Sequence, residues 1–464
     1  MKSILILGAL LTMSLELFAA PPQPNIVFFL VDDLGYADVG FNGGKDIKTP
    51  NIDKLAREGT ILGSHYVQPV CSPTRSALMT GRYPTHTGVY TIVRPHATWG
   101  LPLEERTLAS ALKEVGYETA LTGKWHLGEF ESAYTPNARG FDHQYGHYFG
   151  MIDYFTHTRG NSSDWYRDGK ELKEEGYSTH LITSEACRII QQKEKAKPLF
   201  LYVPFNGVHS PYQVPETYLQ PYDGLKANRR SLAGMLAVVD EAIGKVVTTL
   251  ESTGLRENTL IIFSSDNGGP SPGKVSDNGP LRAGKGTIYE GGVRVCAFAN
   301  WPGHIPSGVT NNEPMHAVDW FPTLVKLAGG SLEQKLPRDG LDVWPMLTQG
   351  AKSPHEVILS ASAPTRAAVR MGDWKLLLNA SEQDSEEAAE GAPGKRKNKA
   401  ASPAEKLELY NLATDIGESI NLATKEPERV ATMRAQLNAL LKDAAPQGQL
   451  GNEEAAIKPS GKSK

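Results

Sequence analysis

The chain has 464 residues, of which 40% are hydrophobic and 22% are charged, and its formal net charge is −4 at pH 7. This length suits one large domain with a smaller one, and the composition is ordinary for a globular protein. The slightly acidic balance excludes a general electrostatic attraction to nucleic acid or anionic lipid, so binding an anion requires a local cluster of positive charge.

The first twenty residues form a predicted export signal. Lys2 precedes an apolar run over residues 4–15, and small residues follow just before Pro21. The run is too short to span a bilayer comfortably, which favours a cleaved signal peptide over a membrane anchor. We therefore expect a signal peptide over residues 1–20 and a periplasmic or secreted protein without stable membrane insertion.

Three continuous apolar runs predict strands that are buried on both faces of a sheet. They are Asn25–Val31, residues 198–203 and residues 259–263. Helical patterns over residues 108–115 and 231–250 lie between them. Strands that alternate with helices predict an α/β fold with a largely parallel sheet, in a domain over residues 21–354.

A smaller subdomain is predicted over residues 355–445. Residues 367–378 suggest a hairpin turned at Gly372 and Asp373, Leu407–Asn411 suggests another strand, and residues 426–442 suggest an amphipathic helix. Segment 381–406 has almost no large apolar residues and is expected to be a mobile loop. A disordered tail is expected over residues 446–464.

Acidic residues follow two of the predicted strands. Asp32 and Asp33 follow the first strand, and Asp266 and Asn267 follow the run that begins at Thr259. Ligands of open α/β sheets bind beyond the carboxyl ends of the strands. These oxygens form a calcium-like or magnesium-like set, whereas zinc requires imidazole or thiolate, and neither adjoins these acids. The alternative is that each acid caps a helix or turn.

The chain has three cysteines, too few for a disulfide framework. Cys187 and Cys296 lie in helical and strand patterns and are interpreted as small buried residues. Cys71 begins the motif Cys-x-Pro-x-Arg, in which Pro73 suits the first turn of a helix. Cys71 would then lie at a helix N-terminus, which favours an anion, with Arg75 one turn further on. A buried structural cysteine is the alternative reading.

This motif, followed by Leu-x-Thr-Gly-Arg at residues 78–82, resembles the signature of the formylglycine-dependent (type I) sulfatases. The resemblance extends from about residue 25 to 342 and more weakly to about 440. It includes residues 123–128 (GKWHLG), 208–211 (VHSP), 266–269 (DNGG) and 290–292 (EGG). It implies an alkaline-phosphatase-like fold, which is a large mixed sheet flanked by helices with a smaller C-terminal α+β subdomain.

The same resemblance implies the cofactors. In this family the cysteine is oxidised during maturation to an aldehyde, C-formylglycine (3-oxoalanine), which is hydrated in the resting enzyme. A formylglycine-generating or sulfatase-maturing enzyme is therefore an implied partner. One calcium ion is implied, with ligands from Asp32, Asp33, Asp266, Asn267 and an oxygen of residue 71 (Cys71).

The resemblance also implies catalytic roles. Arg75, Lys124 and Lys285 neutralise the sulfate. One hydroxyl of the hydrate attacks sulfur and expels the alcohol, and proton loss from the second hydroxyl releases sulfate. We interpret His126 as the base for that release and His209, together with Lys285, as the acid for the leaving alcohol. Lys124, His209 and Lys285 are also expected to contact the substrate.

The expected substrate is a sulfated saccharide. Within the family, residues 88–91, 213–216, 221–223 and 324–328 resemble the arylsulfatase B, or N-acetylgalactosamine-4-sulfatase, branch. This favours a 4-sulfated N-acetylgalactosamine, or a galactose such as that of an algal polysaccharide. Segment 150–168 is rich in aromatic, histidine and charged residues, and Asp153 and His157 within it are expected to contact the sugar.

Two other readings stay open. A phosphomonoesterase or phosphodiesterase of the same superfamily usually has Ser or Thr as nucleophile and histidine-rich ligands for two zinc ions. A non-catalytic sugar-binding homologue would have lost some of the core positions, whereas all of them are present here.

Overall fold

The computed structural model describes residues 23–382 and 405–446. The predicted signal peptide, residues 383–404 of the expected loop and residues 447–464 of the expected tail lie outside the described residues. No helix in the described part of the chain is long and apolar enough to cross a membrane.

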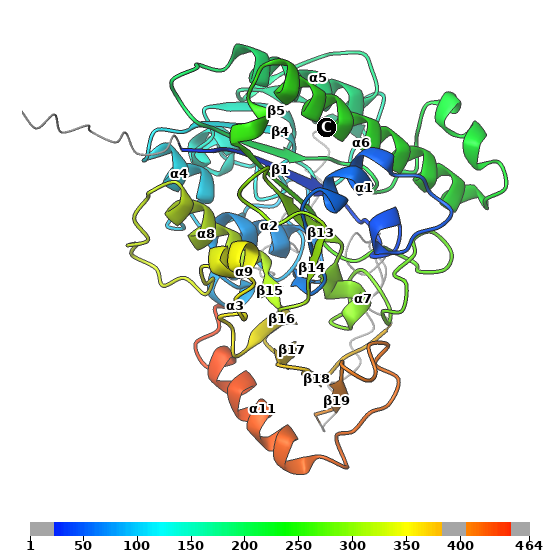
Figure 1. The fold of residues 1–464 in the computed structure, drawn as a ribbon, viewed down its shortest axis with the longest axis vertical. Helices are drawn as coiled ribbons and strands as arrows, with labels where there is room; N and C mark the ends of the chain where they lie inside the picture. The colour runs from blue at the N-terminus through cyan, green and yellow to red at the C-terminus, as the bar shows by residue number, and fades with distance from the viewer. Residues whose placement is uncertain (1–22, 383–404, 447–464) are drawn as a thin grey trace, which may run out of the picture.

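A ten-stranded sheet forms the centre of the molecule (Figure 1). β1 (Asn25–Val31) lies between β10 (Leu199–Pro204) and β11 (Thr259–Ser265) and pairs with both in parallel. These are the three strands predicted from apolar runs, and every residue in them is buried. A strand covered on both faces has no polar alternation, which explains the continuous runs.

The sheet is mixed because antiparallel strands flank its parallel centre, although the edge strand β14 pairs with β2 in parallel. The strand order is β14-β2-β13-β11-β1-β10-β4-β5-β8-β9, with parallel pairing from β11 to β5. β13, β8 and β9 join antiparallel. The remaining strands of this sheet are β2 (Thr60–Leu62), β4 (Glu118–Lys124), β5 (His143–His147), β8 (Tyr166–Arg167), β9 (Lys170–Glu171), β13 (Ala297–Asn300) and β14 (Val309–Asn311).

Helices cover both faces of the sheet (Figure 1). Alternate side chains of β1 enter two separate cores, with Phe29 in one and Phe28 in the other, because successive residues of a strand point to opposite faces. The Phe29 side packs against α1 (Pro50–Arg57), α5 (Ser178–Gln192) and α6 (Ala227–Ser252). The Phe28 side packs against α2 (Cys71–Thr80), α4 (Leu108–Lys113) and α8 (Trp320–Leu327).

The smaller C-terminal subdomain is an antiparallel sheet in the order β16-β17-β18-β19. Met371 pairs with Trp374, so the predicted turn at Gly372 and Asp373 is confirmed, and Gly372 has a φ of 55° there. Apolar residues of this sheet share a core with Ala77 of α2. The elements are β16 (Ile358–Ala363), β17 (Arg366–Met371), β18 (Trp374–Leu378), β19 (Leu407–Asn411) and α11 (Pro427–Leu441), which lies at the lower end in Figure 1.

Shorter elements complete the description. Two small sheets contain β3 (His65–Tyr66), β12 (Arg294–Val295) and β15 (Met315–His316), and β6 (Thr158–Arg159) and β7 (Ser162–Ser163). Short helices are α3 (Pro84–Thr87), α7 (Glu290–Val293), α9 (Trp344–Gln349), η1 (Gly40–Asn42), η2 (Ser132–Tyr134), η3 (Pro136–Arg139), η4 (Glu216–Tyr218), η5 (Gln220–Tyr222), η6 (Arg256–Asn258) and η7 (Ala317–Asp319).

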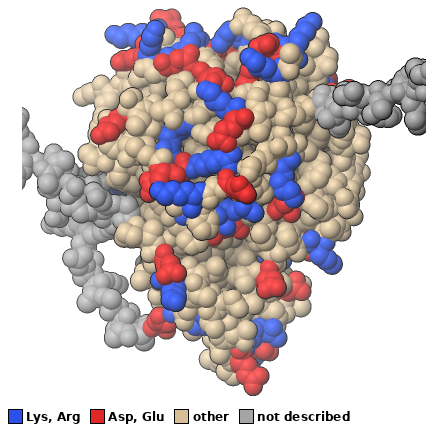
Figure 2. Space-filling view, turned by 90° about the vertical axis from the view of Figure 1, so that its left-hand side faces the viewer, with Lys and Arg blue, Asp and Glu red and all other residues tan. Residues whose placement is uncertain are grey.

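The architecture confirms the predicted combination of a large mixed sheet, flanking helices and a smaller antiparallel sheet with a helix. The domain boundary near residue 354 stays a prediction. On the face in Figure 2, basic and acidic side chains are interspersed, which agrees with the balanced composition.

Candidate active site

Two pairs of polar residues meet at the carboxyl end of the parallel strands. Val31 and Ser265 are register partners, so Asp32 and Asp33 emerge beside Asp266 and Asn267. The backbone N–H of Asp33 donates to Asp266 Oδ1 at 3.2 Å, and Asn267 Nδ2 donates to Asp33 Oδ1 at 2.8 Å. All four side chains are buried. The predicted cluster is therefore formed by the parallel pairing of β1 with β11.

Cys71 is the first residue of α2, as the motif predicted. Val70 before it is extended, and Gly81 ends the helix with a φ of 69°. Arg75 lies one turn further on, and its Nη2 donates to Asp266 Oδ2 at 2.7 Å. Cys71 and Arg75 are both buried. The N–H groups of the first helical turn and the guanidinium of Arg75 thus make this end of α2 suited to an anion.

Two buried lysines lie against the acids. Lys124, the last residue of β4, donates from Nζ to Asp32 Oδ2. Lys285 Nζ donates to Asp33 Oδ2 at 2.8 Å and lies 3.1 Å from Nε2 of His209. The three cations predicted to neutralise sulfate are therefore all in direct contact with the acidic cluster.

Two oxygens of this cluster have no hydrogen-bond partner among the described residues. They are Asp32 Oδ1 and Asn267 Oδ1, and both residues are fully buried. A buried acceptor without a donor is costly, and folded proteins rarely leave one unpaired. A hard cation coordinated by carboxylate and amide oxygens satisfies both atoms. The residues present therefore fit the calcium ion that the family resemblance implies.

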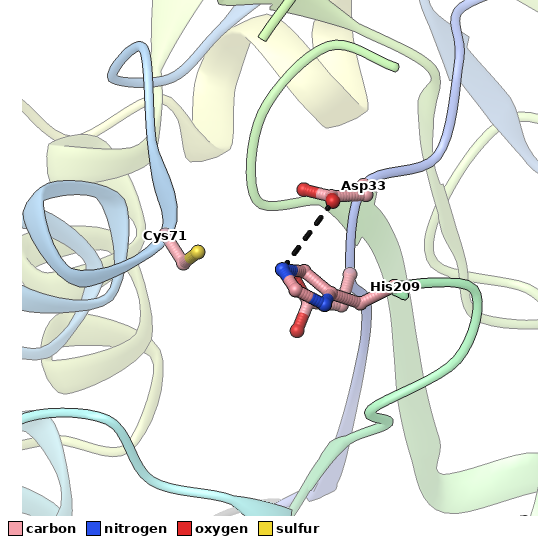
Figure 3. A group of neighbouring side chains, drawn as sticks. Asp33, Cys71 and His209 are labelled. Atoms are coloured by element: carbon pink, nitrogen blue, oxygen red, sulfur yellow. Dashed lines mark ion pairs between the residues drawn. The ribbon is translucent and has the colours of Figure 1, made fainter. Parts of the chain in front are cut away.

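A histidine and the cysteine also adjoin the acids. Asp32, Asp33, Cys71 and His209 each offer a ligand atom, and these atoms all lie within 4.8 Å of one another. Figure 3 shows the sulfur of Cys71 facing His209 and Asp33, whose closest nitrogen and oxygen atoms are 3.6 Å apart. The expectation that neither imidazole nor thiolate adjoins these acids was wrong.

The reason for this error is that the contacts are formed by neighbouring elements rather than neighbouring residues. The loop after β10 is held against the end of β1, because Asp32 N–H donates to Gly207 O at 3.0 Å and Val208 N–H donates to Asp32 O at 2.8 Å. This pairing carries His209 to the acids.

Burial controls the protonation of the site. Burial raises the pKa of the Cys71 thiol to about 12, although Lys124 opposes this. Burial and the charge of Asp266 raise the pKa of Asp32 to about 6. Burial, with the charges of Lys124 and Arg75, holds the pKa of His126 well below its ordinary value. At neutral pH an unmodified Cys71 is thus a protonated, weak nucleophile, and His126 is neutral.

His126 is positioned by backbone contacts. It has a φ of 60°, its N–H donates to Tyr148 O at 3.0 Å, and its carbonyl accepts from Ser72 Oγ at 2.8 Å. A Cβ on Gly150 would lie 2.5 Å from His126 Nε2, so the ring rests against a glycine backbone. These contacts place His126 next to the residue that follows Cys71.

The hydrogen bond of His209 defines its tautomer. Nδ1 lies 2.6 Å from the carbonyl oxygen of Ser210, which can only accept, so Nδ1 carries the proton. The lone pair of Nε2 then faces Lys285 Nζ. The two residues share one hydrogen bond at the edge of the acidic cluster.

Asp153 and His157 already have partners among other residues of the chain. Asp153 accepts from Gln213 Nε2 at 2.6 Å and from the backbone N–H of Phe155 at 2.9 Å. His157 is 3% exposed, and its ring stacks on Trp165 with a centroid distance of 4.4 Å. The contact of both residues with a sugar stays a prediction.

His147 is a residue near the site that the sequence did not reveal. It is the register partner of Lys124 across β4 and β5, it is fully buried, and its Nε2 has no partner among the described residues. Its surroundings in the sequence are those of a core strand, so no signal distinguished it from an ordinary buried histidine.

The chain is similar to known proteins along most of its length. The family model described as Sulfatase matches residues 24–331. Arylsulfatase J of Mus musculus is 37% identical, with 92% of this chain and 77% of that protein covered. N-acetylgalactosamine-6-sulfatase of Mus musculus is 34% identical, with 81% of this chain and 75% of that protein covered. A 6-sulfatase is thus among these relatives, so the similarity does not single out the 4-sulfatase branch.

Solved structures show the same fold. The crystal structure of Ps i-CgsB in complex with k-i-k-neocarrahexaose has a TM-score of 0.83 and 33% sequence identity, and the match covers 94% of this chain and 96% of that chain. Structural relatives confirm the alkaline-phosphatase-like fold that the motifs implied.

Proposed function

The chain belongs to the sulfatase family, whose members hydrolyse sulfate esters, and we propose that its substrate is a sulfated saccharide. We further propose that it uses an aldehyde hydrate at residue 71 and one calcium ion. The observation that carries this proposal is the position of Cys71, at the start of α2 and facing an acidic cluster in which two buried oxygens lack partners.

The calcium ion would be held by oxygens of Asp32, Asp33, Asp266 and Asn267, with an oxygen at residue 71. When bound, it neutralises negative charge on the sulfate and lowers the pKa of a hydroxyl. The group of potential metal ligands contains one histidine, His209, in the part of the chain that was searched. This composition argues against the histidine-rich pair of zinc ions expected of a phosphatase.

The aldehyde would come from oxidation of Cys71, with loss of its sulfur, by a formylglycine-generating or sulfatase-maturing enzyme. Its hydrate supplies two hydroxyl groups on one carbon, one to attack sulfur and one to release sulfate. The buried thiol itself, with its pKa raised to about 12 by burial, is a poor nucleophile at neutral pH. Chemical conversion of the side chain removes this difficulty.

The surrounding residues bind the sulfate and move protons. Arg75, Lys124 and Lys285 supply fixed positive charge in a buried site, where electrostatic stabilisation is strong. The hydrogen bond between Lys285 Nζ and His209 Nε2 provides the proton for the leaving alcohol. His126 is neutral because of burial and nearby cations, so an imidazole nitrogen is free to accept a proton.

We propose a terminal 4-sulfated N-acetylgalactosamine or galactose as the substrate. The saccharide bound in the Ps i-CgsB crystal structure supports the proposal that the substrate of this chain is also a sugar. Segment 150–168 is suitably placed to read it, since Gly150 at its start lies directly against His126.

Matched sugars test this substrate. Sulfate release by the matured protein is measured with 4-sulfated and 6-sulfated N-acetylgalactosamine and with the corresponding galactoses, and Cys71→Ser serves as the inactive control. We expect kcat/KM to be at least about tenfold higher for the 4-sulfates, which corresponds to one or two well-placed polar contacts. A preference for a 6-sulfate would overturn the substrate and leave the sulfatase activity standing. No release from any sulfated sugar would overturn the proposal as a whole.

Maturation and export are proposed together. Protein from its native host is expected to begin near Pro21 and to lie outside the cytoplasm. The mass of the peptide over residues 64–82 would show an aldehyde in place of the thiol. Full activity with an intact thiol at Cys71 would contradict the mechanism.

A further inference from the structure

We propose that Tyr154 is a positioning residue for His209, the residue that we assign with Lys285 to protonation of the leaving alcohol. Tyr154 would act through the backbone of the turn that carries His209, without contacting the substrate itself. The inference rests on the proposed function, because it concerns the proton that is delivered to a sugar oxygen when sulfate is released.

The turn that carries His209 is closed by its own backbone and by one phenol hydroxyl. The N–H of His209 donates to Asn206 O at 3.1 Å. The hydroxyl of Tyr154 lies 2.6 Å from Asn206 O and 2.7 Å from His209 O, so its single proton is shared between the two ends of the turn. All three residues are at most 2% exposed. Tyr154 therefore helps to fix the position of the His209 backbone.

The middle of the same turn is attached to the end of β1. Asp32 N–H donates to Gly207 O at 3.0 Å, and Val208 N–H donates to Asp32 O at 2.8 Å. The turn is thus held to the acidic cluster through Gly207 and Val208 and to Tyr154 through its two ends. Loss of either attachment would change where the histidine lies relative to the acids.

The ring of His209 depends on this backbone for its contacts. Its Nδ1 lies 2.6 Å from the carbonyl oxygen of Ser210, and its Nε2 lies 3.1 Å from Lys285 Nζ. The ring also lies beside Asp33, with Nε2 3.6 Å from Oδ2 (Figure 3). A displacement of the turn would lengthen the contact with Lys285, which is the hydrogen bond that supplies the proton.

Tyr154 is itself held firmly. Its ring stacks on that of Tyr177, with centroids 5.4 Å apart and planes at 21°. Its N–H donates to Gln213 Oε1 at 2.9 Å, and its carbonyl oxygen accepts from Ser178 N–H at 2.8 Å. Burial holds the pKa of its hydroxyl well above the ordinary value, so the hydroxyl stays a donor. A side chain fixed in this way can define the position of its neighbours.

A positioning role and a purely structural role predict different kinetics. When the S–O bond of the ester breaks, its electron pair goes to the leaving oxygen. A sugar oxygen then needs the proton of the Lys285–His209 hydrogen bond, whereas 4-nitrophenolate leaves as a stable anion. Displacement of His209 should therefore slow release from a sugar sulfate far more than from 4-nitrophenyl sulfate. A general loss of structure would slow both equally.

Tyr154→Phe in the matured full chain tests this inference, because it keeps the buried ring and removes only the hydroxyl. kcat is measured with 4-nitrophenyl sulfate and with the sugar sulfate that the native protein hydrolyses fastest. We expect kcat on the sugar sulfate to fall about 10- to 100-fold, as a small displacement of a catalytic group does, and kcat on the aryl ester to change less than about threefold.

Tyr145→Phe is the matched control. Tyr145 lies in the same hydrophobic core and is 1% exposed, but its hydroxyl donates to Glu174 Oε2 at 2.6 Å rather than to the turn. It should keep the native kcat on both esters. Gln213→Ala removes the acceptor of the Tyr154 N–H without altering a buried ring, and it should show the same selective loss at smaller magnitude.

A double variant tests the coupling with the sugar sulfate alone. If Tyr154 acts through His209, then Tyr154→Phe should lower kcat less than about threefold when His209 is already alanine, because the group that it positions is gone. Circular dichroism verifies that each variant is folded.

The outcomes separate this inference from the proposed function. Equal losses on the two esters, or the same loss in the His209→Ala background as in the native one, overturn the positioning role and leave the sulfatase activity standing. Native kcat of Tyr154→Phe on the sugar sulfate overturns it as well. Failure of the native matured protein to hydrolyse any sulfate ester overturns the proposed function, and this inference with it.

Discussion

Two buried clusters of charge in this molecule differ in how completely their oxygens are paired. The subdomain cluster, made of Glu290, Lys375, Glu418, Tyr66 and Arg294, connects the large domain to the C-terminal sheet. Glu290 Oε1 accepts from Lys375 Nζ at 2.8 Å, and Oε2 accepts from the hydroxyl of Tyr66 at 2.8 Å. Glu418 Oε1 has no hydrogen bond among the described residues, but it forms an ion pair with Lys375 Nζ at 3.0 Å. In the acidic cluster, by contrast, Asp32 Oδ1 and Asn267 Oδ1 have no hydrogen-bond partner among the described residues, and the ion pairs of Asp32 with nearby cations involve its Oδ2.

This contrast distinguishes a cluster that holds elements of the fold together from a cluster that can bind a ligand. A buried carboxylate whose two oxygens are both paired can hold elements together without a ligand. A buried carboxylate with an open oxygen is costly unless something else binds there. The two clusters are also adjacent, because Gly268 N–H donates to Gly292 O at 3.0 Å and a Cβ on Gly268 would come within 1.7 Å of Gly291 O. The subdomain cluster therefore supports the loop that carries Asp266 and Asn267 of the acidic cluster.

Asp32→Ala is expected to give the largest effect. Loss of a metal ligand should lower kcat/KM of the matured protein by about 10³-fold, or about 4 kcal/mol of transition-state stabilisation, as measured by sulfate release. The metal-free protein should also lose stability, because Lys124 keeps a buried charge without its carboxylate partner, so the folded state of the variant is verified by circular dichroism.

Asp240→Asn is the matched control. Asp240 is also a buried carboxylate, but its oxygens accept from Asn51 and Ile52, away from the acidic cluster. The Asp240→Asn variant of the matured protein should be less stable than the native protein and should keep the native kcat. If Asp32→Ala retained activity within tenfold of the native protein, the contrast between the clusters would fail.

Lys375→Met removes a lysine of the subdomain cluster. It leaves the charge of Glu290 without its strongest partner and should lower the free energy of unfolding by about 3–5 kcal/mol, measured by urea denaturation. The double variant Glu290→Gln with Lys375→Met should recover part of that loss, because the charge of Glu290 is then removed together with that of Lys375. A loss below about 1 kcal/mol in the single variant would show that the cluster is not structural.

Calcium removal sharpens the comparison. A ligand that binds only the folded state stabilises it, by about 2.7 kcal/mol at a concentration of 100 times Kd. Calcium should therefore raise the Tm of the matured protein, and a chelator should reverse this. Lys375→Met should keep the full response, whereas Asp32→Ala should lose it. An equal response in both variants would place the ion elsewhere.

The smallest expected effect is on pH dependence. Burial, opposed by the charge of Lys375 and assisted by that of Glu290, raises the pKa of Glu418 to about 7. A folded-state pKa above the unfolded value means that the stability contribution is complete below about pH 4.5 and is lost as the pH rises through about 7. We expect the Tm to fall between pH 5 and pH 8, by an amount equivalent to roughly 1–3 kcal/mol.

Glu418→Gln should flatten this fall. In the metal-free protein the pKa of Asp32 is likewise raised, to about 6. The stability that Asp32 contributes is therefore also lost as the pH rises, between about pH 4 and 6. Calcium should remove the contribution of Asp32 and leave that of Glu418. A pH profile unchanged in Glu418→Gln would contradict this assignment.

Local patterns were sufficient to predict the three central strands and the helix that begins at Cys71. β1, β10 and β11 were found because strands covered on both faces are continuously apolar. α2 begins at Cys71 and ends at Gly81, since Pro and Gly act on the backbone of their own residues. The acids after β1 and β11 were placed together because parallel strands end at one edge.

The sequence by itself thus determined the parallel core, the start of α2 and the meeting of the acids at the strand ends, all of which depend on near neighbours or on strand direction. The family resemblance implied that residue 71 adjoins these acids. Only the tertiary structure decided that the imidazole of His209 lies against them, that Lys375 pairs with Glu290, and that His147 lies beside Lys124. These contacts join elements far apart in the chain. Side-chain packing and the order of strands in the sheet create them, and neither leaves a local pattern in the sequence.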